Sequence, residues 1–503
     1  MIWLLACLTA GLISACGFAP LDLWPLTLLG VGFLLFAVER APRLRTALAR
    51  GWWFGFGQFV LGLNWIATAF TYQANMPAWV GWVGVVVLSL YLAIWPAVAA
   101  GLAWRWSGGD RLRLVLIFAA AWVVTEFLRG TLMTGFPWNP LGASLLLTPA
   151  AMFAALAGTY ALGGLAALSG GVAYLLARRD WLRGGVLAAG LFVLVGLAFL
   201  ATPAPDGPPG AKVRLVQPNI SQDVKHSVGY EPQLERFEQS GATLSGGPTL
   251  LLWPEDGVPF MLDEEPWEAE EIGSWIRPGD LVLTGGTKLE REGGRRAVGA
   301  RNSVHVVNHE GQLVARYDKA HLVPWGEYLP LRGLLEPIGL ARVVPGDIDF
   351  WEGPGPQSID LPGFGRVGMQ ICYEIVFSGH VVDRANRPDF IFNPSNDAWF
   401  GWWGPPQHFA QARLRAVEEG LPVVRATPTG VSGIVDARGN VVEAVPSHEY
   451  GAIDAQVPAA AAPTLFARFG NWLAFVFAGL LIVASAFTGR LKSGRARANE
   501  TRT

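Results

Sequence analysis

The feature that most constrains this chain is a long uncharged stretch in its N-terminal part. From Gly51 to Ala103 the sequence contains no Asp, Glu, Lys or Arg. The hydrocarbon core of a bilayer needs about 20 apolar residues for each helix that crosses it, so this stretch is long enough for two such helices. The sequence therefore predicts a protein that is built into a membrane.

The composition of the whole chain agrees with this prediction and excludes an ordinary soluble protein. Hydrophobic residues make up 51% of the 503 residues and charged residues only 16%, against about 25% charged in a typical globular chain. The 22 tryptophans are an excess that is typical of proteins whose aromatic rings lie at membrane interfaces. Three cysteines cannot form a disulfide framework, and Cys372 is the only one of them in the polar part of the chain.

Apolar segments that are separated by polar residues, Gly and Pro predict eight transmembrane helices. An even number of spans places both chain termini on one side of the membrane. The domain prediction is helices within 1–203, a polar domain over 211–457, a last helix within 466–490 and a basic tail over 491–503. The predicted spans are 2–18, 21–39, 51–71, 79–104, 112–129, 149–177, 184–202 and 470–489.

The placement of arginine predicts the orientation of these helices. The connections after the second, fourth and sixth spans and the C-terminal tail are basic, whereas the alternate connections carry almost no positive charge. Short basic connections stay in the cytoplasm, so the polar domain between the seventh and eighth spans is expected on the opposite, periplasmic side. The basic connections contain Arg40, Arg43, Arg45, Arg50, Arg105, Arg111, Arg113, Arg178, Arg179 and Arg183.

The polar domain is predicted to be a layered α/β domain. The Pro- and Gly-rich linker 201–211 marks its beginning, and short β-rich runs then alternate with polar connections. Helical patterns are clearest over 233–244 and 405–420. The predicted strands are 213–217, 249–253, 281–286, 303–308, 312–317, 366–372, 389–393, 422–426 and 433–437.

Three of these strands lead directly into a reactive polar residue. LLLWPED ends near Glu255, VARYDKAHLVPWGEY places Lys319 just past a strand, and VGMQICYE contains Cys372 at a strand end. Active-site groups are common where a rigid strand gives way to a loop. Each residue also has a simpler interpretation, because a Glu or Lys in such a place is usually solvated and a lone Cys is usually a small buried hydrophobe.

Taken together, the three residues resemble the catalytic set of the nitrilase superfamily, a Glu, a Lys and a Cys in that chain order. The motifs LLWPED, YDKAHLVPWGEYLP, GMQICYEIVF and SNDAWFG further resemble the apolipoprotein N-acyltransferase family within it. The membrane segments GFAPLDLWPL, GFGQFVLGLNWI and EFLRGTLMTGFPWNPLG are similar to that family as well. The resemblance extends from about residue 12 to residue 489, and it implies a nitrilase-like α-β-β-α sandwich beside an eight-helix transmembrane bundle.

The chemistry of the three side chains fits this resemblance. A cysteine is a strong nucleophile only as its thiolate, so Glu255 is expected to take the proton of the Cys372 thiol. Lys319 is expected to stabilise the negative charge of a tetrahedral intermediate. The family resemblance implies further supporting residues: Glu327 would orient Lys319 or relay protons, and Tyr373 and Glu374 would shape the pocket. For Glu374, a strand-end salt bridge is an equally good interpretation.

Other positions of the motifs have less defined roles. Asn396, Asp397 and Trp399 are expected in a loop beside the site, as structural support or in direct contact with it, and Arg413, Arg415 and Glu418 as charge pairs that hold the fold. Two positions depart from the family pattern. His226 stands where the family tends to have a Trp, and Asn139 stands where it usually has an apolar or aromatic residue.

The resemblance implies the reaction and the partners. The acyl donor would be a membrane phospholipid, and the acceptor would be the free α-amine of a diacylglyceryl-cysteine at the N-terminus of an apolipoprotein. The protein is expected to be a monomer in the bacterial inner membrane, without cofactor, metal or nucleic acid. His305, His309 and His321 lack a closed set of acid or thiol ligands. The apolar residues of 331–344 either gate lipid entry or form a packed surface helix.

Two rival functions are less well supported by the sequence. A membrane-anchored nitrilase-type amidase would use water at the thioester, but it would need one membrane anchor rather than eight. A transporter with an accessory domain would need charges paired along a pathway through the membrane. For such a pathway the membrane segments offer chiefly Glu126 and Arg129.

Overall fold

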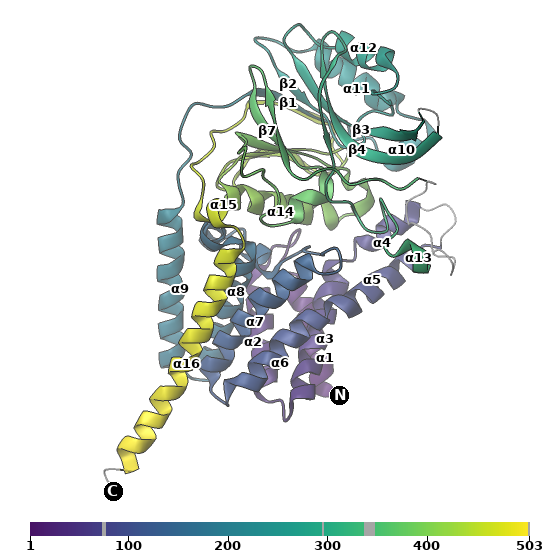
Figure 1. Cartoon of the computed structure of the whole chain (residues 1–503). Coiled ribbons are helices and arrows are strands. Elements are labelled where there is room, and N and C mark those ends of the chain that lie inside the picture. The colour runs from purple at the N-terminus through teal and green to yellow at the C-terminus, as the bar shows by residue number, and fades with distance from the viewer. Residues whose placement is uncertain (73–76, 294–295, 336–347, 501–503) are drawn as a thin grey trace. The chain divides into compact units, whose positions relative to one another are not determined.

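A computed structural model of the chain describes residues 1–72, 77–293, 296–335 and 348–500 (Figure 1). The chain divides into two compact units, one helical and one built on β-sheets. The helical unit consists of Met1–Ala67, Gly81–Pro203 and Pro463–Thr503, and the second unit consists of Thr68–Val80 and Ala204–Ala462.

Each of the eight predicted spans overlaps a helix of the structure. The predicted span 79–104 is interrupted near Ala93, where α5 ends and α6 begins. The helices are α1 (Ile2–Ala15), α2 (Trp24–Glu39), α3 (Leu44–Gly62), α4 (Ile66–Ala69), α5 (Trp79–Leu92), α6 (Ile94–Ser107), α7 (Arg111–Thr131), α8 (Phe153–Ala177), α9 (Trp181–Ala201), α15 (Leu465–Phe469) and α16 (Trp472–Glu500).

Three helical segments of the described chain are long and apolar enough to cross a bilayer: Trp79–Ser107, Pro149–Ala177 and Trp181–Ala201. Shorter apolar helices cover Ile2–Ala15, Trp24–Glu39 and Trp472–Thr488. In α9 only 11% of the apolar window is buried, and side chains such as Phe192 and Leu200 are exposed. An apolar helix that exposes its side chains in this way is suited to a lipid environment, whereas the full set of eight spans stays a prediction.

Helix α8 is the buried centre of the helical unit, and glycines let its neighbours approach closely. A Cβ atom on Gly171 would lie 2.2 Å from Cγ1 of Val115 in α7, and one on Gly170 would lie 2.9 Å from the carbonyl oxygen of Leu28 in α2. Small residues are used in the same way where helices pack within membranes, because the backbones can then come close together.

The two charges of α7 that a transporter would need for a pathway are engaged with a loop. Arg129 donates hydrogen bonds to the carbonyl oxygens of Phe136 and Trp138, each at 2.8 Å. Glu126 accepts one from the backbone N–H of Leu141 at 2.8 Å. The pair therefore satisfies backbone groups of the GFPWNPLG segment, as irregular backbone buried among apolar helices requires.

In its described residues the second unit contains two six-stranded sheets, and each has three parallel strands in its middle. The first has the order β12-β1-β2-β3-β4-β5 and the second the order β11-β10-β9-β8-β7-β6. The strands are β1 (Lys212–Gln217), β2 (Leu250–Leu252), β3 (Leu281–Glu292), β4 (Arg296–Asn308), β5 (Leu313–Asp318), β6 (Gln357–Leu361), β7 (Gly365–Met369), β8 (Phe390–Pro394), β9 (Val423–Ala426), β10 (Ser432–Val435), β11 (Val441–Val445) and β12 (Gly451–Gln456).

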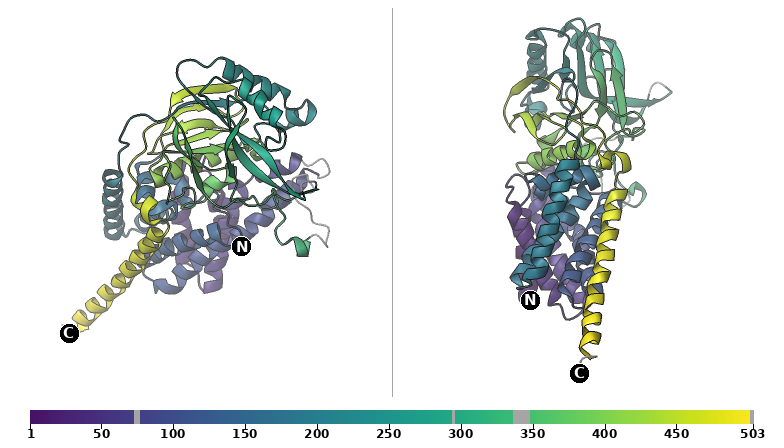
Figure 2. Two further views of the ribbon diagram at one scale, coloured as in Figure 1. Left: turned by 45° about the horizontal axis from the view of Figure 1, so that its top comes forward. Right: turned by 90° about the vertical axis from the view of Figure 1, so that its left-hand side faces the viewer.

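The two sheets pack face to face around one apolar core. Leu215 and Leu252 of the first sheet join Val367 and Phe392 of the second in a single buried cluster. Helices α11 (Glu231–Ala242) and α12 (Pro266–Ser274) cover the outer face of the first sheet, and α14 (Gly404–Glu419) covers the second (Figures 1 and 2). This arrangement confirms the predicted α-β-β-α sandwich.

The sequence missed some elements of this unit and misplaced others. Strands β6, β11 and β12 and helices α10 (Gln222–Ser227) and α12 were not predicted. The predicted strand 366–372 is too long, because β7 ends at Met369 and Cys372 begins a separate 3-10 turn. Within the predicted gating segment 331–344, a short helix α13 covers Arg332–Leu335, and residues 336–344 lie outside the described part of the chain.

Candidate active site

Glu255, Lys319 and Cys372 come from both sheets. Glu255 follows β2 and Cys372 follows β7, each beyond the carboxyl end of a central parallel strand, where α/β proteins commonly form their sites. Lys319 directly follows β5. Three segments that are distant in sequence thus bring a carboxylate, an ammonium and a thiol into one buried cluster.

Lys319 lies between two carboxylates. Its Nζ is 3.4 Å from Oε1 of Glu255 and 3.0 Å from Oε1 of Glu327, and its side chain is only 1% exposed. Burial alone would lower the pKa of the ammonium, but Glu327 and Glu255 outweigh this effect, so the pKa of Lys319 lies above its usual value. Lys319 therefore stays a cation at any physiological pH.

Asn302 of β4 completes this cluster, although no pattern in the sequence pointed to its role. Its Nδ2 donates to Oε1 of Glu255 at 2.7 Å and to Oε1 of Glu327 at 2.8 Å. Its carbonyl oxygen accepts the backbone N–H of Lys319 at 2.8 Å. Asn302 thus holds both acids and the lysine in place. The predicted strand began only at residue 303, and an Asn just before it carries no local signal of such a contact.

The second oxygen of Glu255 is held from the other sheet. The backbone N–H of Asn396, just beyond β8, donates to Oε2 of Glu255 at 2.7 Å. Both oxygens of Glu255 are therefore oriented, one by Asn302 and one by Asn396. A base that is fixed in this way reaches its proton in one defined geometry.

Cys372 is buried and has a left-handed backbone conformation, with φ = 50°. Burial, and then the charge of Glu255, raise the pKa of its thiol well above the usual value, while Lys319 opposes them. The resting residue is thus a protonated thiol. Its proton must leave during the attack, and Glu255 is the carboxylate whose charge acts on it most strongly.

Glu374 ties the turn of Cys372 to the loop that follows Lys319. Its carboxylate accepts backbone N–H groups from Ile371 at 2.6 Å, from Ala320 at 2.7 Å and from His321 at 3.0 Å. The hydroxyl of Tyr317 also donates to it, at 2.9 Å. Burial raises the pKa of Glu374 to about 7. Hydrogen bonds to these donors replace the strand-end salt bridge that the sequence left open.

The other predicted residues lie around the cluster. The ring of Tyr373 packs edge-on against Phe377, with 5.1 Å between the centroids, and it is almost fully buried. Asp397 is buried and pairs with Arg425, whose Nη2 is 2.7 Å from its Oδ2.

The helical pattern that was predicted to hold charge pairs is helix α14. Arg415 and Glu418 form a buried ion pair there at 3.0 Å, as predicted. Arg413 donates to the carbonyl oxygen of Gly439 at 2.8 Å.

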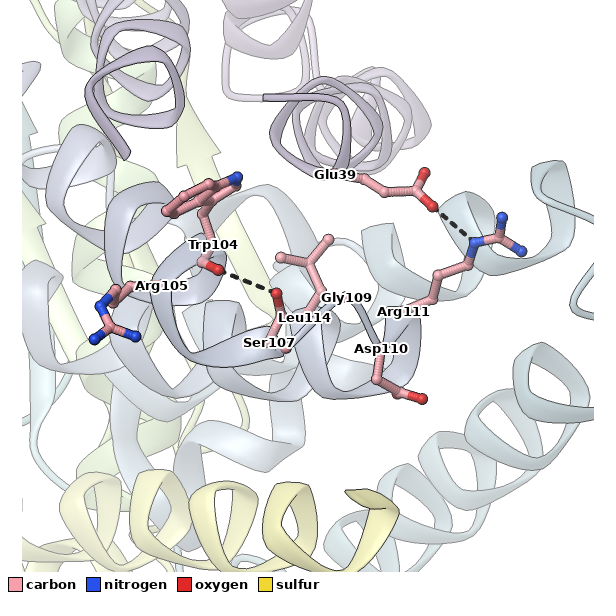
Figure 3. Close-up of a pocket in the computed structure, with 9 residues that line it drawn as sticks. Glu39, Trp104, Arg105, Ser107, Gly109, Asp110, Arg111 and Leu114 are labelled. Atoms are coloured by element: carbon pink, nitrogen blue, oxygen red, sulfur yellow. Dashed lines mark hydrogen bonds and ion pairs between the residues drawn. The ribbon is translucent and has the colours of Figure 1, made fainter. Parts of the chain in front are cut away.

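The helical unit has a separate hollow of about 520 Å³, which shares no residue with this cluster (Figure 3). It is lined by the end of α2, the end of α6 and the start of α7, among them Trp104, Arg105 and Asp110. Figure 3 shows the ion pair of Glu39 and Arg111 at one side of it, at 2.8 Å. The lining residues lie in, or at the ends of the helices beside, the basic connections that the sequence predicts at the cytoplasmic face.

A carboxylate, an ammonium and a thiol in a buried site are suited to acyl chemistry through a covalent thioester. Such a site can pass the acyl group to water or to an amine, and its three side chains alone do not decide between these acceptors. The acceptor is indicated by the proteins that this chain resembles.

The chain matches known proteins along most of its length. Residues 10–172 match the family model described as apolipoprotein N-acyltransferase N-terminal domain, and residues 212–464 match the model described as carbon-nitrogen hydrolase. Among solved structures, Nit3 of Saccharomyces cerevisiae, a member of the nitrilase superfamily, is 20% identical with a TM-score of 0.37, and the match covers 51% of this chain and 93% of that one.

Curated relatives match over both units. The apolipoprotein N-acyltransferase of Rhodopseudomonas palustris is 34% identical over 95% of this chain and 93% of its own length. The protein of the same name from Bradyrhizobium diazoefficiens is 35% identical, over 95% of this chain and 94% of its own length. The chain therefore belongs to the apolipoprotein N-acyltransferase family.

Proposed function

We propose that the protein transfers an acyl chain from a membrane phospholipid to the α-amine of a diacylglyceryl-cysteine at the N-terminus of apolipoproteins. The observation that carries this proposal is the buried cluster of Glu255, Lys319 and the Cys372 thiol in a member of this family. Cys372 is the proposed nucleophile, Glu255 the general base and acid, and Lys319 the cation that stabilises the oxyanion. Glu327 and Asn302 would orient Lys319 and Glu255.

In the first half of the reaction, the sulfur of Cys372 attacks the ester carbonyl of the phospholipid. A C–S bond forms while the thiol proton passes to Glu255, and the negative charge on the carbonyl oxygen is stabilised by Lys319. The tetrahedral intermediate then collapses, and its bond to the glycerol oxygen breaks. That oxygen takes the proton back from Glu255, so that the products are a thioester on Cys372 and a lysophospholipid.

In the second half, the neutral amine of the lipoprotein attacks the carbonyl carbon of the thioester. A C–N bond forms, Glu255 accepts a proton from the nitrogen, and the C–S bond breaks. The departing sulfur takes the proton from Glu255 as the C–S bond breaks, so the enzyme returns to its starting state and the product is an amide. Since the high pKa of the Cys372 thiol disfavours a free thiolate, we expect proton transfer to accompany each attack.

A labelled donor and a matched pair of acceptors test this function. The full-length protein in detergent is incubated with a diacyl phospholipid that carries an isotope-labelled acyl chain, and Cys372 is examined by mass spectrometry. We expect the label on Cys372. Adding a peptide with an N-terminal S-diacylglyceryl-cysteine should move the label to the peptide amine, whereas the same peptide with an acetylated amine should leave it on Cys372.

The acceptor pair separates the proposed transferase from a nitrilase-type amidase. An amidase would release labelled fatty acid to water at the same rate with either peptide. That result, or an absence of label on Cys372 in folded protein, would contradict the proposed function.

We further propose that eight helices cross the inner membrane and that the sandwich unit faces the periplasm. The support is the alternation of basic connections with connections that carry almost no positive charge, together with the apolar helices of the helical unit. At that face ATP and acyl-CoA are not expected, so the bilayer itself would supply the acyl group.

Reporter fusions test this orientation. Alkaline phosphatase, which folds only outside the cytoplasm, should be active when it is fused after Ala204 and inactive when it is fused after Arg43. Green fluorescent protein fused at the same two positions should give the opposite pattern. Active phosphatase at Arg43 would refute the proposed orientation.

A further inference from the structure

A buried polar network contacts the backbone of the nucleophile, and two of its three members, His408 and Arg425, were assigned no role in the site from the sequence. His408 of α14, Asp397 after β8 and Arg425 of β9 are each 1% exposed or less. Buried polar side chains are costly unless they are fully hydrogen-bonded. Three buried polar side chains in mutual contact therefore indicate that they hold a particular part of the structure in place.

The network ends on the backbone of the nucleophile. Nε2 of His408 is 3.1 Å from the carbonyl oxygen of Cys372. Nδ1 of His408 is 2.9 Å from Oδ1 of Asp397 and 3.0 Å from Nη2 of Arg425. That Nη2 also donates to both carboxylate oxygens of Asp397, at 2.8 and 2.7 Å. The imidazole is thus held on one side by a fixed ion pair and reaches the nucleophile with the other.

The Cys372 backbone needs such a contact. At φ = 50° a residue with a side chain is in a sterically unfavourable conformation. It persists only where neighbouring groups hold it. The amide of Asn393 also approaches the Cys372 carbonyl, but at 3.5 Å it is at the limit of a hydrogen bond. The contact from His408 is the shorter of the two.

We propose that His408 is a positioning residue for the acyl transfer: its Nε2–H holds the carbonyl of Cys372 and so fixes the left-handed turn that aims the sulfur at the donor. This inference deepens the proposed function and rests on it for the identity of the nucleophile. A carbonyl oxygen can only accept, so Nε2 carries a proton whether the imidazole is neutral or charged. Burial, and then Arg425, lower the pKa of His408, whereas its contacts with Asp397 and with the Cys372 carbonyl raise it.

The same network is also connected to the proposed base, Glu255, through Asn396. Asp397, which His408 and Arg425 hold, directly follows Asn396, whose backbone N–H donates to Glu255 at 2.7 Å. The N–H of Asn396 also lies against the thiol of Cys372 and opposes the rise of its pKa. One buried cluster therefore sets the backbone of the nucleophile and the backbone group that orients its base.

A small activated ester tests the position of the nucleophile without phospholipid or lipoprotein. A p-nitrophenyl acyl ester should acylate Cys372 in a rapid burst that releases p-nitrophenolate. In the full-length protein we expect His408→Leu to slow the saturating burst rate by about tenfold or more, with little change in the ester concentration for half-maximal rate. His408→Gln should recover most of the rate, because its Nε2 can present an N–H where the histidine Nε2 was.

Two further variants separate positioning from general stability. His305 of β4 is also fully buried and paired with a carboxylate, Asp263, at 2.8 Å, so His305→Leu should lower the melting temperature while leaving the burst rate per folded protein near wild type. His408→Asn, whose shorter amide places its N–H near the Nδ1 position, should stay slow. If the His408→Leu protein does not accumulate, the burst rates of His408→Gln and His408→Asn alone test the positioning role.

The proposal is overturned if the Gln and Asn variants have equal burst rates, or if the rate of His408→Leu falls only as far as that of an equally destabilised His305→Leu. Failure of the proposed function has a different signature. In that case the phospholipid would leave no label on Cys372, while the burst with the activated ester would still depend on His408.

Discussion

Replacing Cys372 with Ala should abolish acyl transfer and leave no labelled acyl-enzyme after incubation with phospholipid. Without the sulfur no thioester can form, and losing the nucleophile of a covalent mechanism lowers the rate by on the order of 10⁴-fold or more. The fold should survive, because the side chain is small and its buried neighbours tolerate a methyl group. Transfer of label to the acceptor peptide measures the loss of acyl transfer. Mass spectrometry of the intact protein measures the loss of the acyl-enzyme.

The matched control for this variant is Cys16→Ser. Cys16 lies in the helical unit, directly after α1, and is partly exposed, so its replacement should leave acyl transfer near the wild-type rate. A folded Cys372→Ala protein that still carried label on the sandwich unit would show that another residue is the nucleophile. Cys372→Ser would then be informative, since an oxygen ester on the new hydroxyl would appear only if the side chain at position 372 attacks the acyl donor.

Replacing Glu374 with Ala should destabilise the sandwich unit strongly. The change leaves the N–H groups of Ile371, Ala320 and His321 without their acceptor. Each buried donor that loses its partner costs about 1–3 kcal/mol. For a unit of this size, we expect the melting temperature in detergent to fall by about 10 °C or more.

Two variants calibrate this prediction. Glu374→Gln keeps an oxygen for Ala320 and His321 but places an amino group against the N–H of Ile371, so its melting temperature should lie between those of the wild type and the Ala variant. Glu443→Ala removes an exposed carboxylate on β11 and should shift the melting temperature by no more than about 1 °C. Equal melting temperatures for Glu374→Ala and Glu443→Ala would mean that the Glu374 carboxylate does not hold the turn.

The sequence was most informative where local pattern and chemistry coincide. Short β-rich runs that end in Glu255, Lys319 or Cys372 marked both the strands and the reactive groups, because parallel strands end at a common edge where loops carry polar side chains. The apolar segments identified the helices, because a helix that is buried in lipid needs an unbroken run of apolar residues.

What the sequence could not show are the contacts between distant segments. Asn302 lies in the middle of a strand and His408 on an amphipathic helix, and neither has a neighbour in sequence that hints at its partner. In the sequence, Arg425 is only a single charged residue within a predicted strand. Strand β12 was missed because its sequence, GAIDAQ, lacks the apolar run by which the central strands were recognised, whereas β11, with the sequence VVEAV, carries such a run and was overlooked.

The order of the strands in the first sheet has a consequence for the protein during its synthesis. β1 (Lys212–Gln217) is the first strand of its unit to be synthesised, yet its outer neighbour is β12 (Gly451–Gln456), the last. Glu255 belongs to the sheet that β12 completes, while Cys372 belongs to the other. While the chain is still being synthesised, Glu255 and Cys372 therefore lie in sheets that are not yet complete. We expect the Cys372 thiol to remain unreactive until β12 pairs with β1 and completes the first sheet.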